Sequence, residues 1–153
     1  MLAGAAVAGL LVALLSPIAA FAQAETTTVH VSGTESSPDV NPCTGATGTA
    51  TQTLRGVEHV TELPNGTSHV TSTVTGSFTF VPDDPSQPTY TGHATFWFGE
   101  NVNGKAFTTT FTGHVNVRGT DGSRITDHFV AHVTVNPDGT ATVEFETERL
   151  SCP

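Results

Sequence analysis

The chain has 153 residues, 14 of them acidic and 5 basic, so its formal net charge at pH 7 is −9. An acidic surface of this kind repels phosphate backbones and anionic lipids, which argues against nucleic acid and anionic membranes as partners. The length is enough for one domain with a hydrophobic core.

The first 24 residues carry no charged side chain and contain the apolar run 10–15. Small residues follow at alternate positions, which is typical of cleavage after Ala22 or Ala24. We therefore expect residues 1–24 to be a secretory signal peptide, the protein to be secreted, and residues 25–153 to form a single β-barrel domain. An uncleaved N-terminal anchor is the alternative, because the apolar run approaches the ~20 residues that span a bilayer. We expect no other contact with a membrane.

Beyond residue 24 the hydrophobic pattern has a period of two, and no helical period is present. The sequence predicts an all-β, antiparallel meander of seven or eight strands. The expected strands are 26–32, 50–62, 67–81, 89–98, 106–118, 123–135 and 140–150. Gly, Pro, Ser and Asp predict a long loop over 33–47, and three prolines predict a stiff loop over 82–88.

Phenylalanines and histidines fall on opposite phases of this alternation. The phenylalanines beyond residue 24 share a phase with most valines, whereas all 7 histidines share a phase with the threonines. Because successive side chains of a strand point to opposite faces, we expect an aromatic core face and a Thr/His face. A long meander of this kind closes most economically into a barrel, which removes exposed edges. A two-sheet sandwich folded at the proline loop is the alternative.

Turn residues predict how the strands pair. Asn103-Gly104 is typical of a two-residue type I′ turn. A three-residue loop with Gly in the left-handed conformation fits the segments 63–67, 119–123 and 136–140. In the last hairpin this loop pairs Val133 with Val143. The shifted pairing with Glu144 would mix the two faces and is not expected.

The predicted pairing also gives a candidate metal site on the Thr/His face. It places His93 opposite His114, His114 opposite His128, and His128 opposite Glu148. Three imidazoles and a carboxylate suit Zn²⁺ or Cu²⁺. Opposed Cβ atoms lie about 5 Å apart, however, and side chains splay on the outside of a barrel. We therefore expect a solvated face and no cofactor, with a metal-binding protein or metal-dependent enzyme as an alternative.

Four further residues stand out from the pattern. Trp97 on the Thr/His phase and Tyr90 near the start of a strand are candidate ligand-binding residues, since aromatic rings stack on sugars and other rings. Glu58 and Asp127 break the aromatic phase. A carboxylate on that face must be hydrogen-bonded, paired with a base or near a rim, and if buried it becomes a candidate acid or base.

The chain contains two cysteines, Cys43 and Cys152. In an exported chain an even pair predicts a disulfide. It would close a loop of about 110 residues, worth ~4–5 kcal/mol in the chain-entropy model.

Three stretches resemble an uncharacterised family of small secreted bacterial proteins. They are VNPCTG (40–45), PTYTGHATFWFGENVN (88–103) and, within 118–146, RGTDGSRI and HVTVNPDGTATVEFE. The resemblance covers most of the chain beyond the leader and implies export and a compact β-fold. It implies no activity and no functional residues.

The motifs of common catalytic sites are absent from the sequence: there is no G-x-S-x-G, no Gly-rich phosphate loop and no H-E-x-x-H. We expect a secreted, disulfide-stapled binding or structural module without catalysis. Its partner would be an unknown small molecule or extracellular protein. An alternative is a carrier of small apolar ligands with a Phe-lined lumen.

Overall fold

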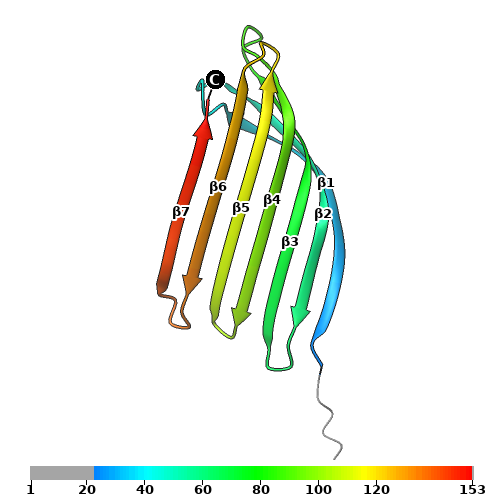
Figure 1. Ribbon diagram of the computed structural model, residues 1–153, viewed down its shortest axis with the longest axis vertical. Coiled ribbons are helices and arrows are strands. Elements are labelled where there is room, and N and C mark those ends of the chain that lie inside the picture. Colours follow the sequence, from blue (N-terminus) through cyan, green and yellow to red (C-terminus); the bar gives the residue numbers. More distant parts are fainter. Residues whose placement is uncertain (1–22, 153) are drawn as a thin grey trace, which may run out of the picture.

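The computed structural model describes residues 23–152 as one antiparallel sheet of seven strands. The strands follow each other in space as they do in the chain (Figure 1). They are β1 (Glu25–Val40), β2 (Thr47–Glu62), β3 (Thr67–Pro82), β4 (Tyr90–Asn103), β5 (Ala106–Gly119), β6 (Arg124–Val135) and β7 (Ala141–Ser151). The predicted all-β, up-and-down meander is therefore confirmed.

The predicted signal peptide lies outside the described residues, apart from Gln23 and Ala24. In the part of the chain that the structure describes, no helix is long and apolar enough to cross a membrane.

Six of the predicted strands agree with the structure to within a few residues, and the exception is the first. β1 continues to Val40, so most of the predicted loop over 33–47 is strand. Pro38 lies in this extension, opposite Thr49 of β2. A proline is tolerated there because β1 is an edge strand, whose outward N–H positions need no partner. The actual loop is short and covers residues 41–46.

The predicted three-residue loops are confirmed. Gly66, Gly122 and Gly139 all have positive φ, and each donates its N–H to the residue three positions earlier. The type I′ turn is wrong. Asn103 pairs with Ala106, so the two turn residues are Gly104 and Lys105, and of these only Gly104 has positive φ. Gly at the first central position is the signature of a type II′ turn. The pairing of β4 with β5 therefore differs by two residues from the prediction. Each side chain stays on the expected face of the sheet but lies opposite a different residue of the neighbouring strand.

The last hairpin departs further from the prediction. Its turn is the expected one, but a β-bulge at Thr134/Val135 shifts the pairing of β6 with β7 by one residue. Val133 consequently lies opposite Glu144, the arrangement that the hydrophobic pattern disfavours. The shift turns Phe145 to the Thr/His face and turns Glu144, Glu146 and Glu148 to the aromatic face. Inward-pointing charges on an edge strand are a known protection against strand addition, and β7 is an edge.

The sheet is strongly coiled but open. Among the described residues, β1 pairs with β2 alone and β7 with β6 alone, so the predicted closure into a barrel is not found. Coiling is permitted by glycines on the aromatic face: a Cβ on Gly76 would lie 1.9 Å from the carbonyl oxygen of Thr53, and one on Gly92 would lie 2.0 Å from that of Asn116. Figure 1 shows the upper parts of β1 and β2 curling behind the other strands, toward the end of β7.

The buried core sits at this curled end. It consists of Ala50, Phe80, Tyr90, Val117 and Ile125, with Phe78, Val115 and Cys43 packed against it. A second aromatic group, midway along the sheet, surrounds Gly113, because the ring of Phe129 occupies the place of the missing side chain. Phe96 and Phe111 complete this group, with ring centroids 5.9 Å apart.

Candidate ligand-binding site

A disulfide joins the two edges of the sheet at the curled end. The predicted bond between Cys43 and Cys152 is present, with an S–S distance of 2.05 Å. Cys43 lies in the loop after β1, and Cys152 follows β7. The bond therefore links two strand ends that have no backbone pairing, and we call this end of the open sheet, joined by the disulfide alone, the closed end.

The loop that carries Cys43 is held by Asn41, which is 4 % exposed. Its Oδ1 accepts hydrogen bonds from the backbone N–H of Cys43 at 2.9 Å and of Thr44 at 3.2 Å. The carbonyl oxygen of Asn41 accepts a third bond, from the N–H of Gly45. A buried amide that satisfies several backbone donors fixes the loop and so orients Cys43 toward Cys152.

A cavity of about 270 Å³ lies against the core at the disulfide end, and we call it the cup. Its apolar wall consists of Phe78, Phe80, Tyr90, Val115, Val117 and Ile125. The remaining lining residues are Asp39, Val40, Asn41, Pro42, Asp127 and Glu148. Both edge strands contribute, so the cup spans the gap between β1 and β7.

Tyr90 belongs to the apolar wall of the cup and is 2 % exposed. Its hydroxyl oxygen lies 3.0 Å from Oγ of Ser123, which in turn lies 2.5 Å from Oδ1 of Asp121. Ser123 has a single hydroxyl proton, and a carboxylate is the stronger acceptor. The serine therefore donates to Asp121, and the phenol of Tyr90 donates to the serine. This chain of hydrogen bonds fixes the ring and ties it to the turn between β5 and β6.

The same turn affects the acidity of Asp121. Hydrogen bonds from the side chain and then the backbone N–H of Ser123 stabilise the carboxylate and lower the pKa of Asp121 below its usual 3.8. Asp84 and Asp138 have the same geometry two residues before Ser86 and Thr140, whose backbone N–H groups are the main cause of their lowered pKa values.

Three carboxylates line the cup from three strands. Asp39 comes from β1, Asp127 from β6 and Glu148 from β7. Asp127 lies opposite Val115 on the aromatic face, and its Oδ1 is buried with no hydrogen-bond partner. For Asp127, the break in the hydrophobic alternation was a sequence signal that could identify it as a functional residue. No such signal existed for Glu148, which the bulge brings to this face, or for Asp39, which was expected in a loop.

The predicted metal row is not assembled. His114 lies opposite His128, as predicted, with ring centroids 6.4 Å apart. His93, however, lies opposite Asn116 because of the type II′ turn, and His128 lies opposite Arg149 because of the bulge. Glu148 faces the opposite side of the sheet. Within residues 23–152, no three His, Cys, Asp or Glu side chains lie close enough together to hold a metal ion.

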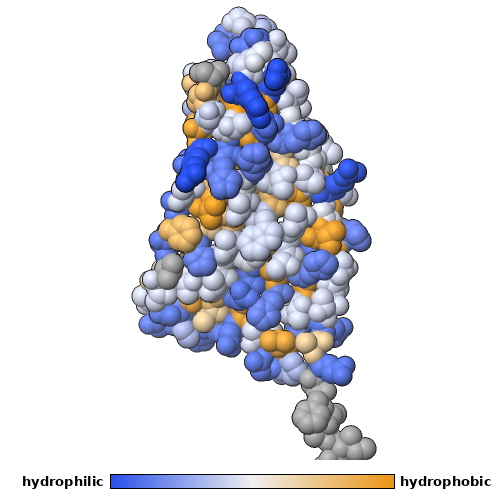
Figure 2. Space-filling view, in the orientation of Figure 1, coloured by the Kyte–Doolittle hydropathy of each residue, from blue (hydrophilic) through white to orange (hydrophobic). Residues whose placement is uncertain are grey.

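Two histidines of the Thr/His face, His59 and His132, instead bond to the threonines directly opposite them. His59 Nδ1 lies 2.9 Å from Oγ1 of Thr28, and His132 Nδ1 lies 2.7 Å from Oγ1 of Thr110. Pairs of threonines do the same, as in Thr34 with Thr53 at 3.0 Å. Such cross-strand pairs stabilise a sheet. The face seen in Figure 2 has this character: pale and hydrophilic residues dominate, with scattered hydrophobic ones.

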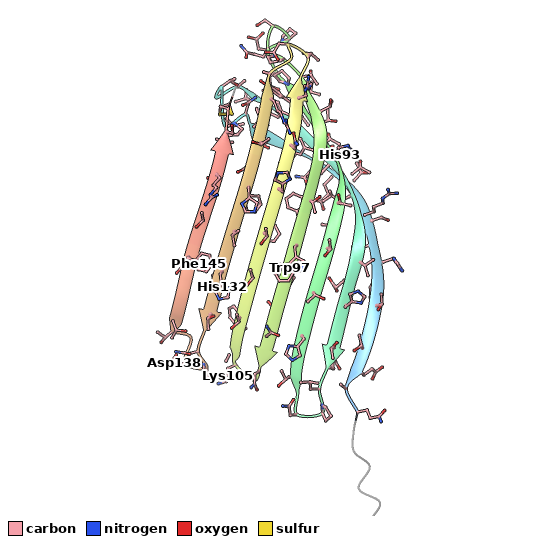
Figure 3. The ribbon with its side chains drawn as sticks, viewed as in Figure 1. His93, Trp97, Lys105, His132, Asp138 and Phe145 are labelled. Carbon is pink, nitrogen blue, oxygen red and sulfur yellow. A yellow bond between two sulfur atoms is a disulfide. The ribbon has the colours of Figure 1, made fainter. Side chains whose placement is uncertain are left out.

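Trp97 and Tyr90, the two aromatic residues predicted to bind a ligand, lie on opposite faces of β4. Trp97 is 39 % exposed on the Thr/His face, and its ring covers Gly99. On the same face, His132 of β6 and Phe145 of β7 stack with ring centroids 5.4 Å apart (Figure 3). Tyr90 belongs to the cup, so the two residues cannot form one site.

Comparison with models of protein families, with curated proteins and with solved structures finds no match to this chain.

Proposed function

We propose that the protein is a secreted binding module that holds a small organic molecule in the cup, without catalysing a reaction. The observation that carries this proposal is the cup itself: a cavity with an aromatic and aliphatic wall and a few polar groups at its rim. Ligand sites of proteins generally combine these features. At about 270 Å³ the cup is just below the ~300–1,000 Å³ of drug-sized sites, so its ligand is small.

Secretion is part of the proposal. It is supported by the apolar, uncharged leader in the sequence and by the disulfide, since such bonds persist mainly in oxidising compartments. The disulfide also has a direct role at the site, because it keeps the two edges that line the cup at a fixed separation.

The open sheet argues for the cup over a Phe-lined lumen along the whole molecule. Toward the opposite end, Phe107 on the aromatic face is 37 % exposed, whereas Phe80 in the cup is 4 % exposed. A ligand gains most from burial where the walls already exclude water on several sides. The carrier function, if restricted to the cup, is compatible with this geometry.

A titration with 2-phenylethanol, a small neutral probe with one ring, tests the proposal. We expect binding by calorimetry to the disulfide-bonded protein, and at least about tenfold weaker binding to Val115→Phe, whose larger side chain would fill the cup. Val102→Phe is the matched control, because Val102 lies on the aromatic face near the opposite end, opposite Phe107. Absence of binding to the unmodified protein, or equal binding to Val115→Phe, would contradict the proposal.

A further inference from the structure

We propose that the ligand of the cup is an organic ammonium ion, that is, a protonated amine attached to a small apolar body. This inference rests on the proposed function and specifies the chemical class of its ligand. It follows from the charge of the lining, from one unsatisfied oxygen atom and from the aromatic wall.

The charges that face the cup are all negative. Asp39, Asp127 and Glu148 line it, and no Lys, Arg or His is among the lining residues. Carboxylates drawn from both edges and from β6 thus surround one cavity without a counter-charge in its wall. The whole chain adds to this field with a net charge of −9. A cation is attracted to such a site and an anion is repelled from it.

Asp127 supplies a specific contact. Its Oδ1 is buried and has no hydrogen-bond partner in the protein. A buried acceptor without a partner costs free energy, and the cost is larger for a charged group. Asp127 as a residue is partly exposed, so a rotation of its carboxylate would turn this oxygen toward an N–H group of a bound ammonium ion, which would satisfy it with a charge-assisted hydrogen bond. A ligand with a hydrogen-bond donor would therefore satisfy an acceptor that the protein itself leaves without a partner.

The aromatic wall fits the same ligand. Phe78, Phe80 and Tyr90 line the cup beside the carboxylates. Aromatic faces attract cations and also bury the apolar part of the molecule that carries the charge. A metal ion has no apolar part to bury against these rings, and the three carboxylates do not come close enough together to bind one. The arrangement favours an ammonium ion over both a metal ion and a neutral hydrocarbon.

The test compares three probes that share a phenyl ring and are nearly equal in size: 2-phenylethylamine, 2-phenylethanol and phenylacetate. At pH 7 the amine is protonated. Calorimetric titration should show the amine binding about tenfold to a hundredfold more tightly than the alcohol, which is the range expected for one charge-assisted hydrogen bond. Phenylacetate should bind more weakly than the alcohol.

Two substitutions locate the effect. In Asp127→Asn and in Glu148→Gln the ratio of the affinity for the amine to the affinity for the alcohol should fall at least about threefold. Glu146→Gln is the matched control, because Glu146 lies on the same face of β7 but outside the cup. It should leave both affinities unchanged. Glu148 is exposed, so its substitution leaves the fold intact and keeps the test valid even if Asp127→Asn fails to fold.

The outcomes separate the two proposals. If the alcohol binds in the cup and the amine binds no more tightly, the ammonium inference is wrong and the binding function stands. If the amine is preferred but Glu146→Gln weakens it as much as Glu148→Gln does, the preference comes from the overall charge and the inference is again wrong. If none of the three probes binds, both proposals fail.

Discussion

Phe80 and Phe107 show how different the two ends of this sheet are. Both are phenylalanines on the aromatic face, and the hydrophobic alternation predicts the same burial for both. Phe80, near the disulfide, is 4 % exposed, whereas Phe107, near the opposite end, is 37 % exposed. Phe80 belongs to the buried cluster at the end where the disulfide links the two edges of the sheet, whereas Phe107 lies at the end where nothing links them. Burial in this molecule depends on closure of the sheet as well as on hydrophobic phase.

The two edges also share a property that keeps them apart. Glu35 and Asp39 lie on the aromatic face of β1, and the bulge turns Glu144, Glu146 and Glu148 to the same face of β7. Carboxylates that point inward from both edges repel one another and discourage direct pairing. At the closed end these charges line the cup; at the open end they lie in solvent.

Removing the disulfide should abolish the difference between the ends and have the largest effect on stability. The bond links residues 109 positions apart. The double substitution Cys43→Ser/Cys152→Ser should lower the free energy of unfolding by ~4–5 kcal/mol, because the unfolded chain loses its cross-link. Urea unfolding of the oxidised protein and of the variant measures this directly. A loss below ~1 kcal/mol would show that the closed end holds without the bond.

Truncating one phenylalanine at each end sharpens the comparison. Phe80→Ala should cost ~3–4 kcal/mol, since it leaves a cavity in a buried cluster. Phe107→Ala should cost less than half as much, because its ring already contacts solvent. Urea unfolding curves of both variants give the two values. Equal losses would mean that the open end is as well packed in solution as the closed one.

Substituting two glycines that lie opposite the same residue tests whether the sheet is tightly coiled. Gly33 and Gly76 both lie opposite Leu54, from β1 and β3. A Cβ on Gly76 would lie 1.9 Å from a backbone oxygen, whereas one on Gly33 would have nothing within 4 Å. Gly76→Ala should therefore cost ~1–3 kcal/mol. Gly33→Ala should change the free energy of unfolding by less than ~0.5 kcal/mol. Similar values for the two would contradict the tight coil.

The smallest predicted effect is a pH dependence of the turns. Hydrogen bonds from Ser123 lower the pKa of Asp121 below 3.8 in the folded state. A depressed pKa stabilises the fold above the unfolded value, and this contribution is lost as the pH falls through the lower, folded value. Melting temperatures between about pH 2 and pH 6 should show Asp121→Asn less sensitive to acid than the unmodified protein. An identical pH dependence would show that this turn contributes nothing to acid stability.

The sequence predicted the parts of this structure that depend on local chemistry. Strand phases, the three-residue loops at Gly66, Gly122 and Gly139, and the disulfide follow from alternation, turn residues and cysteine count. The bulge in the last hairpin does not, because it opposes the hydrophobic pattern at an exposed edge where the pattern carries little energy. It alone moved Glu148 from the expected metal row to the cup. The cup itself depends on coiling over several strands, which no single stretch of sequence encodes.

The proposed binding function requires that the cup, and no other surface of the protein, receives the ligand. NMR chemical shifts of the isotope-labelled, disulfide-bonded protein during a titration with 2-phenylethylamine test it most directly. We expect the largest shifts at the backbone amides of Phe80, Tyr90 and Asp127, and none at the indole N–H of Trp97 on the opposite face. Shifts concentrated around Trp97, or no shifts at a saturating concentration of the amine, would contradict the claim.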